Sequence, residues 1–335
     1  MIKLISSRPL SPTLFGAGAI LLCMFLRATD LLFRNNTLKT LPPLTLITVE
    51  HLLVTIALFT VLPLCSKDKF KDSYPHPRQL RSLNTKGVAL LLFIACGSSV
   101  GGILSFTTAF QLIHPAVVIL LQKLQPLVVI IFAFIFLKER PTPSFYLWAT
   151  VALIAGYILS FGWVLPSLVL AKQAIKIQGL GWALLSVFLW GSGTVAGKYL
   201  LSGSSGQQIS TSDLTKFRYI FGTIFALILL LTLRPPVDGL IDGLMVLPHG
   251  PTLLTLLPSL LYMSLIAGYL AIRLFYWGLR FTSSASASIY ELFYPLSALL
   301  IGQIFLEQKL NVIQISAGLV LMFAMTRISQ LRTHA

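Results

Sequence analysis

Two long apolar segments of this chain, residues 101–159 and 267–325, repeat one pattern at a constant distance. In the first, a Leu-Gln-Pro-Leu run contains Pro126 and is followed by Phe-Leu-Lys-Glu-Arg; in the second, Phe-Tyr-Pro-Leu contains Pro295 and is followed by Phe-Leu-Glu-Gln-Lys. The offset is constant, because 295 − 126, 305 − 136 and 309 − 140 all equal 169. A membrane bundle built by duplication usually encloses a solute site at the interface of its halves. The duplication therefore favours solute transport as the function.

The composition requires most of the chain to avoid water. Hydrophobic residues make up 56% of the 335 residues, charged residues make up 10%, and the mean hydropathy is +0.86. A membrane-spanning helix needs about 20 apolar residues, and the sequence contains ten such stretches. Membrane β-barrels instead use strands of about ten residues with alternating polarity, which runs such as 126–137 do not show. The expected spans are 14–33, 44–64, 87–110, 115–137, 144–165, 179–200, 214–233, 253–277, 283–306 and 310–328.

The ten spans divide into two units of five, which predicts an all-α membrane protein with two inverted five-helix repeats. Because five is odd, two similar units in succession cross the membrane in opposite senses. We expect the first repeat at residues 1–163, a linker at 164–178 and the second repeat at 179–335.

The net charge of +15 is spread over the loops between apolar spans, so we interpret it as a signal for orientation rather than for nucleic-acid binding. Lys and Arg are more frequent on the side of the N-terminus, chiefly because of the basic loop 65–86. Since cytoplasmic loops carry an excess of Lys and Arg, we expect both termini in the cytoplasm, with the chain in a bacterial inner membrane. A monomer and a homodimer both remain open.

Charged residues inside the expected spans are candidates for function, because a charge at mid-membrane costs at least about 2.5–3.5 kcal/mol on insertion scales. Arg27, Asp30 and Arg34 are spaced three and four apart, so they share one face of the first span. They are either a self-neutralising cluster or part of a gate or substrate site. Glu50 in the second span and Arg218 in the seventh occupy equivalent regions, so they are a candidate ion pair between the repeats.

The strongest candidates for substrate contact come from the duplicated segment. Adding 169 maps Gln122 onto Glu291 and Gln125 onto Tyr294, and both pairs precede a proline closely. Gln122 lies roughly 10 Å deep at 1.5 Å per residue. Proline removes a backbone donor and opens the carbonyl ladder of a helix, so two polar faces beside helix breaks predict a central cavity; interhelical hydrogen bonding is the alternative. Trp190 and Tyr290 are further candidates for substrate contact, and Lys123 and Arg273 for gating or ion pairs.

The sequence contains no complete motif for nucleotide binding or for metal binding. Residues 192–199 resemble a phosphate-binding loop, but Ser replaces the first Gly and Tyr replaces the closing Ser or Thr. The five histidines and three cysteines show no metal-ligand spacing. We therefore expect no enzyme activity, no metal and no cofactor.

The end of each duplicated segment resembles the EamA-type transporters of the drug/metabolite transporter superfamily. That family pattern has a proline within the span, an apolar run closing in Leu-Gly-Glu-basic, and then two glycines seven apart. In the first repeat the run closes in Leu-Lys-Glu-Arg at Glu139, followed by Ala149 and Gly156. In the second it closes in Leu-Glu-Gln-Lys at residues 306–309, followed by Gly318 and Met325. The motifs depart from the pattern in three ways: Lys138 replaces the glycine before Glu139, the acid of the second repeat comes one place early, and one glycine of each pair is replaced. They identify no substrate.

The resemblance implies alternating access and transport of a small metabolite, often by export, with the lipid bilayer and the solute as partners. We expect an exporter of a small metabolite such as an amino acid, with Glu291 as the candidate for charge recognition or proton coupling. The alternatives are an exporter of multiple drugs or cationic amphiphiles, and a membrane scaffold or sensor without transport.

Overall fold

The computed structural model describes residues 12–60, 77–165, 176–203, 208–233, 253–305 and 311–331, and within these ranges every regular element is helical. Nine helical stretches in this part of the chain are long and apolar enough to cross a membrane, and a shorter apolar helix of 17 residues, α3 (Pro43–Phe59), accompanies them. The prediction of an all-α membrane bundle of about ten spans is therefore confirmed. Most of the expected linker at 164–178 lies outside the described residues. The nine stretches are Pro12–Arg34, Thr85–Leu112, Pro115–Leu137, Pro143–Phe161, Ile177–Ser202, Thr211–Leu233, Thr255–Phe281, Ser284–Phe305 and Val312–Ser329.

Several spans consist of more than one helical element. Short π-helical segments, labelled η, interrupt three of them, and the first span changes direction between α1 and α2. The ninth span consists of α16 and α17, and the remaining spans are single helices. The elements are α1 (Pro12–Thr29), α2 (Leu31–Thr37), α5 (Pro77–Arg81), α6 (Thr85–Leu92), η1 (Phe93–Gly101), α7 (Gly102–Leu112), α8 (Pro115–Gln122), α9 (Gln125–Phe132), η2 (Ala133–Leu137), α10 (Pro143–Phe161), α12 (Ile177–Ser202), α13 (Thr211–Leu233), α14 (Leu253–Leu261), η3 (Tyr262–Leu270), α15 (Ala271–Phe281), α16 (Ser284–Tyr290), α17 (Phe293–Phe305) and α18 (Val312–Ser329).

The three-dimensional repeat follows the offset found in the sequence. The π-helical segments η1 and η3 begin 169 residues apart, since 262 − 93 = 169, and α10 and α18 do the same, since 312 − 143 = 169. A π-helical turn has an extra residue per hydrogen-bonded ring and is often found at functional sites. Its presence at matched positions in the third and eighth spans supports a common origin of the two halves.

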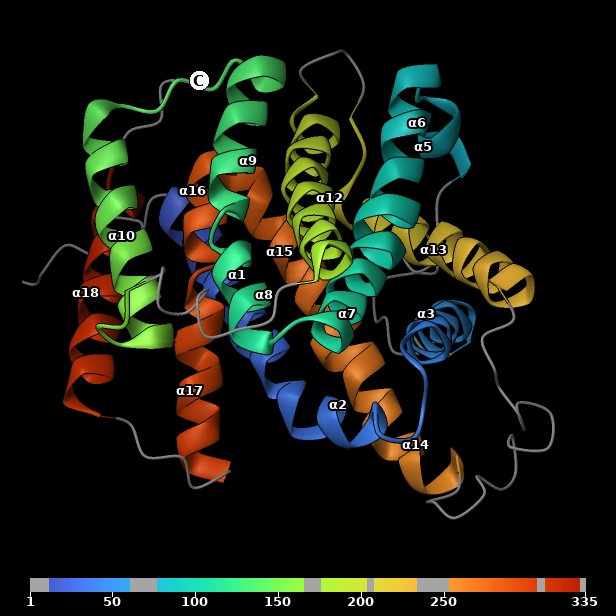
Figure 1. The fold of residues 1–335 in the computed structure, drawn as a ribbon. Helices are drawn as coiled ribbons and strands as arrows, with labels where there is room; N and C mark the ends of the chain where they lie inside the picture. The colour runs from blue at the N-terminus through green and yellow to red at the C-terminus, as the bar shows by residue number, and fades with distance from the viewer. Residues whose placement is uncertain are drawn as a thin grey trace, which may run out of the picture.

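The two repeats are interleaved rather than stacked side by side. Helix α1 of the first repeat packs along α15 of the second, and α12 of the second packs along α7 of the first. The pairs α10 with α18 and α3 with α13 lie at opposite edges of the bundle (Figure 1). Every main interface therefore joins the two halves, and the centre of the bundle is formed by both.

Glycines allow the closest of these approaches. A Cβ atom placed on Gly16 of α1 would lie 2.8 Å from the carbonyl oxygen of Gly278 of α15. The matching contact in the other half involves Gly179 of α12, where a Cβ would lie 2.5 Å from Ile113. Small residues of this kind let membrane helices pack backbone against backbone.

The fourth and ninth spans are each broken near the middle. Lys123 and Leu124 separate α8 from α9, and Glu291 and Leu292 separate α16 from α17. In the fourth span the break directly precedes Pro126, whose ring removes a backbone donor. The breaks place the polar residues of the duplicated segment inside the bundle instead of on a continuous apolar helix.

Candidate solute-binding site

The two helix breaks meet at the centre of the bundle. The side-chain amide of Gln125, at the start of α9, donates from Nε2 to Oε2 of Glu291 at 2.8 Å, and Glu291 ends α16. Gln122, at the end of α8, donates from Nε2 to Oγ of Ser186 on α12 at 2.6 Å. Ser186 in turn donates to the carbonyl oxygen of Ala183 at 2.7 Å. Three of the four residues that the repeat offset selected therefore lie in polar contacts between spans.

Three acceptor atoms near this centre have no donor. Oε1 of Glu291, Oε1 of Gln122 and Oδ1 of Asp30 are buried and make no hydrogen bond to any described residue. A buried polar atom without a partner costs roughly 1–3 kcal/mol. Such atoms are therefore candidates for contact with water or with a bound solute.

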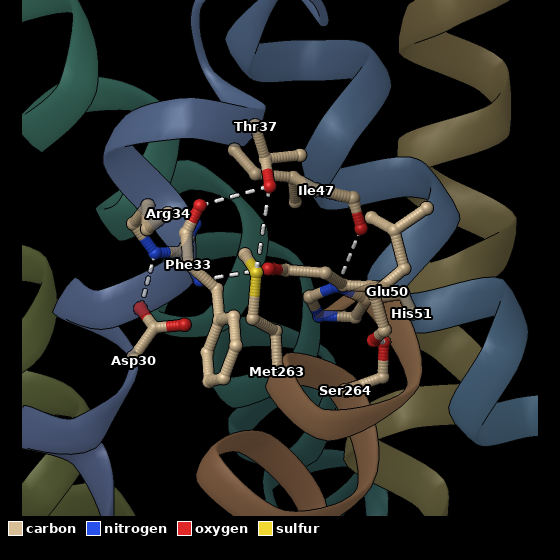
Figure 2. A network of polar contacts seen from close by, with 10 residues as sticks. Asp30, Phe33, Arg34, Thr37, Ile47, Glu50, His51, Met263 and Ser264 are labelled. Atoms are coloured by element: carbon tan, nitrogen blue, oxygen red, sulfur yellow. Dashed lines mark hydrogen bonds and ion pairs between the residues drawn. The ribbon is translucent and has the colours of Figure 1, made fainter. Parts of the chain in front are cut away.

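Arg34 joins the first span to the second. Its Nη2 donates to Oε1 of Glu50 at 2.7 Å, and its Nε binds the carboxylate of Asp30 (Figure 2). Figure 2 also shows Thr37 donating to the carbonyl oxygen of Phe33 at 3.0 Å, which fixes this turn of α2. The guanidinium of Arg34 is thus the counter-ion of two carboxylates, so Asp30, Arg34 and Glu50 together carry one excess negative charge.

Arg27 is the cation that is free to balance that excess. It lies two turns before Arg34 on the same span, and its guanidinium makes no hydrogen bond or ion pair with a described residue. It is nevertheless within electrostatic reach of Glu50 and of Glu291. A guanidinium and the free oxygen of a carboxylate, two groups of opposite sign without a direct partner among the described residues, therefore lie within electrostatic reach of each other.

A second buried network connects four elements. Nε of Arg218 on α13 donates to Oγ of Ser99 on η1 at 3.0 Å, and its Nη1 donates to the hydroxyl of Tyr276 on α15 at 2.8 Å. Ser99 is also 3.0 Å from Nε2 of His51 on α3, whose Nδ1 is 2.9 Å from the carbonyl of Ile47. Because a carbonyl only accepts, Nδ1 carries the proton of its contact with Ile47. The Ser99 hydroxyl therefore links the imidazole of His51 to the guanidinium of Arg218.

This arrangement differs from the pairing expected between Glu50 and Arg218. Glu50 instead forms its ion pair with Arg34, and Arg218 donates to two neutral oxygens. The reason is geometric: Arg34 lies on the neighbouring first span and reaches Glu50 directly, whereas Arg218 is turned toward η1 and α15. Sequence position within equivalent spans does not specify this choice.

The remaining candidates occupy different surroundings. Tyr294, partly buried on α17, is within electrostatic reach of Asp30 and Arg27. Trp190, partly buried on α12, packs against Phe106 with a centroid separation of 5.1 Å. Their roles in substrate contact stay predictions.

Three candidates lie away from the polar contacts described above. Tyr290 is 2% exposed and packs in the main apolar core. Lys123 is partly buried at the α8–α9 break and has no partner among the described residues. Arg273 is exposed on α15, where it interacts with Tyr269. The proposed contact or gating roles of these residues also stay predictions.

The sequence offers no reason to select Ser186, marks Ser99 only as one of a run of small residues, and marks Tyr276 only as a secondary candidate beside Arg273. Hydroxyl residues are frequent in membrane helices, and nothing in the local sequence separates these from others. Only the positions of the neighbouring spans identify them. Within the described part of the chain, no cluster of three or more His, Cys, Asp or Glu residues has the arrangement of a metal site.

Comparison with known proteins places these features in a family. A model described as the EamA-like transporter family matches residues 14–162 and again residues 177–329. A curated relative, the riboflavin transporter ImpX of Fusobacterium nucleatum, is 30% identical over 249 residues, covering 72% of this chain and 77% of the relative. A solved crystal structure superposes with a TM-score of 0.64 over 94% of this chain and 95% of its own; at 16% identity the likeness shows the fold alone.

Proposed function

Because the chain belongs to the EamA-like transporter family, we propose that it moves riboflavin, or a solute of the same chemistry, across a membrane by alternating access. The observation that carries this choice of solute is the 30% identity to a riboflavin transporter over most of both chains. The protein is an integral, multi-pass membrane transporter of a small solute, and the proposal concerns which solute.

The polar groups at the two helix breaks have the chemistry to bind such a solute. Riboflavin is uncharged at neutral pH and offers many donors, the hydroxyls of its ribityl chain and the imide N–H of its ring. The free acceptor oxygens of Glu291, Gln122 and Asp30 need donors of this kind. Trp190 lies one helical turn from Ser186, so its ring is on the same face as the hydroxyl that holds Gln122. An aromatic face beside a polar group suits a flat ring with a polar edge.

A second candidate is an amino acid, the solute first expected from the family resemblance. The observation in its favour is the pair of opposite charges without direct partners, Arg27 and the Oε1 side of Glu291. A zwitterion would place its carboxylate at Arg27 and its ammonium at Glu291. The same resemblance makes export the expected direction.

Glu291 is the candidate for proton coupling. It lies at a helix break in the middle of the bundle, accepts one hydrogen bond from Gln125 and has one free oxygen. A proton bound there would remove the charge that the solute meets, and would thereby link proton release to solute binding. The expected setting is a bacterial inner membrane with both termini in the cytoplasm, as a monomer or homodimer.

The test is counterflow in proteoliposomes. Purified protein is reconstituted with unlabelled riboflavin inside and labelled riboflavin outside, and accumulation of label above that of empty liposomes supports the proposal. Competition with a ring lacking the ribityl chain, with ribitol, with a panel of amino acids and with cationic amphiphiles then defines the solute class. Reconstituting the protein in both vesicle orientations gives the direction. Exchange of amino acids without exchange of riboflavin would refute the flavin assignment, and exchange of neither would refute both.

A further inference from the structure

Two charged side chains form hydrogen bonds to the short turn between α15 and α16. Lys198 of α12 directs its Nζ at the C-terminal end of α15 and donates to the carbonyl oxygens of Leu279 at 3.0 Å, Arg280 at 3.2 Å and Thr282 at 2.6 Å. The last carbonyls of a helix have no intrahelical donor and carry partial negative charge. The ammonium group therefore satisfies the end of the eighth span.

Glu139 holds the other side of the same turn. Its Oε1 accepts from the backbone N–H of Ser284 at 2.9 Å and its Oε2 from that of Ala285 at 3.2 Å, the first amides of α16. Glu139 belongs to the first repeat and α16 to the second, so these bonds join the halves. Lys198 is within electrostatic reach of Glu139. The turn is thus held between an anion and a cation.

The backbone before Glu139 is arranged for this contact. Lys138 has φ 57° and ψ 24°, a left-handed conformation that costs a non-glycine residue about 1–2 kcal/mol. The N–H of Glu139 then returns to the carbonyl of Ala133 at 3.1 Å, which closes η2. The family pattern has glycine at the position of Lys138, where this conformation carries no such cost. The strained residue directs the carboxylate of Glu139 toward α16.

The equivalent turn of the first repeat is built differently. It lies between α7 and α8, at the opposite end of the bundle, and its amide at Ala116 is capped by Nδ1 of the adjacent His114 at 3.2 Å. That cap comes from the turn itself rather than from the other repeat. Gln308, which is 169 residues after Glu139, lies outside the described residues. Among the described residues, the clamp of two charges is therefore specific to the Glu139 end.

We propose that the bonds from Glu139 to α16 form a gate that closes the Glu139 end of the bundle and positions α16, which is followed directly by Glu291, while Lys198 fixes the same turn from within the second repeat. The inference rests on the proposed transport cycle, because alternating access requires contacts between the halves to break at one end while the other end closes. Helix α16 has seven residues, so it spans about 10 Å at 1.5 Å per residue. Glu139 is bonded at one end of it and Gln125, through Glu291, at the other. Release of the gate therefore moves the solute-binding carboxylate.

Spin-label distances at both ends of the bundle test the gate. In a background without Cys23, Cys65 and Cys96, one pair of labels is placed at the exposed Arg140 and Arg280, and a second pair at the exposed Lys39 and Ile177, at the far end. Glu139→Ala should raise the population of long distances in the first pair at least about tenfold, because it removes two charge-assisted hydrogen bonds and the loss of one alone corresponds to about tenfold. The second pair should keep or shorten its distance.

Matched variants separate the gate from general loosening. Glu139→Gln keeps one acceptor and should give a smaller change, and Lys198→Met should give a change in the same direction. Lys138→Gln keeps a non-glycine residue in the left-handed conformation and removes only a side-chain charge that makes no bond to the turn, so it should give no change. Equal broadening of both pairs, or an unchanged first pair, would overturn the inference. The measurement needs no solute, so it can fail while riboflavin transport stands, and it can succeed for a protein that moves another solute.

Discussion

Replacing Glu291 by Gln tests whether the free oxygen of this carboxylate, Oε1, contacts the solute. In the wild-type protein the Glu291 carboxylate accepts from Gln125 at 2.8 Å through Oε2, and its Oε1 is free for a donor of the solute. The substitution preserves the size and shape of the side chain but removes its negative charge. A hydrogen bond to a charged acceptor contributes about 1.5–3 kcal/mol, and one between neutral groups about 0.5–1.5 kcal/mol. The difference is about 1–1.5 kcal/mol for the single bond from the solute. We therefore expect the Kd for riboflavin to rise about tenfold, since 1.4 kcal/mol is one decade.

Two measurements follow from this variant. Equilibrium binding of labelled riboflavin to the purified protein gives the change in Kd, and transport with and without a proton gradient gives the coupling. If Glu291 carries the coupling proton, Glu291→Gln should retain exchange of solute but lose stimulation by the gradient. Gln125→Leu is the comparison, because it removes the neighbouring donor and keeps the charge, so it should remain gradient-driven. A Glu291→Gln protein with wild-type affinity and wild-type response to the gradient would refute the assignment.

Three further substitutions test the packing around the site, each by thermal melting of the purified protein. Arg34→Gln leaves Glu50 without its buried counter-ion and should destabilise the fold by about 3–5 kcal/mol; an unchanged midpoint would argue against the ion pair. Gly278→Leu should cost about 1–3 kcal/mol by overpacking, because its Cβ would lie 2.5 Å from a backbone oxygen of α1, whereas Gly18→Leu, where nothing lies within 4 Å, should be neutral. Ser99→Ala removes the hydroxyl that links His51 to Arg218 within one buried network and should cost about 1–3 kcal/mol; stability equal to wild type would contradict the network.

The sequence was sufficient to predict the architecture because its two signals are long and periodic. Apolar stretches of about 20 residues identify membrane spans regardless of their neighbours, and the constant offset of 169 relates the halves. The same offset recurs in the structure between η1 and η3. The π-helical segments themselves were not predicted, because an extra residue in a helical turn leaves no mark in the composition of an apolar run.

The site was predictable only in part, since sequence identifies residues but not their partners. The repeat offset selected Gln122, Gln125 and Glu291, which the structure brings into contacts between spans. It did not reveal that Glu50 would pair with Arg34 rather than with Arg218. That choice depends on how the spans interleave, and interleaving is a property of packed surfaces that a single sequence with two similar halves leaves open.

The interleaved packing also constrains how such a transporter can move. If the repeats were separate blocks, they could rock as rigid bodies, but α1 lies along α15 and α12 along α7 for most of their length. These pairs, closed by glycine contacts at Gly16 and Gly179, cannot separate without exposing backbone to lipid. The fourth and ninth spans are instead interrupted at their centres, and the Gln125–Glu291 bond joins them at the breaks. We therefore expect alternating access to proceed by rotation of the half-helices about these two breaks, with the long helix pairs as the fixed frame.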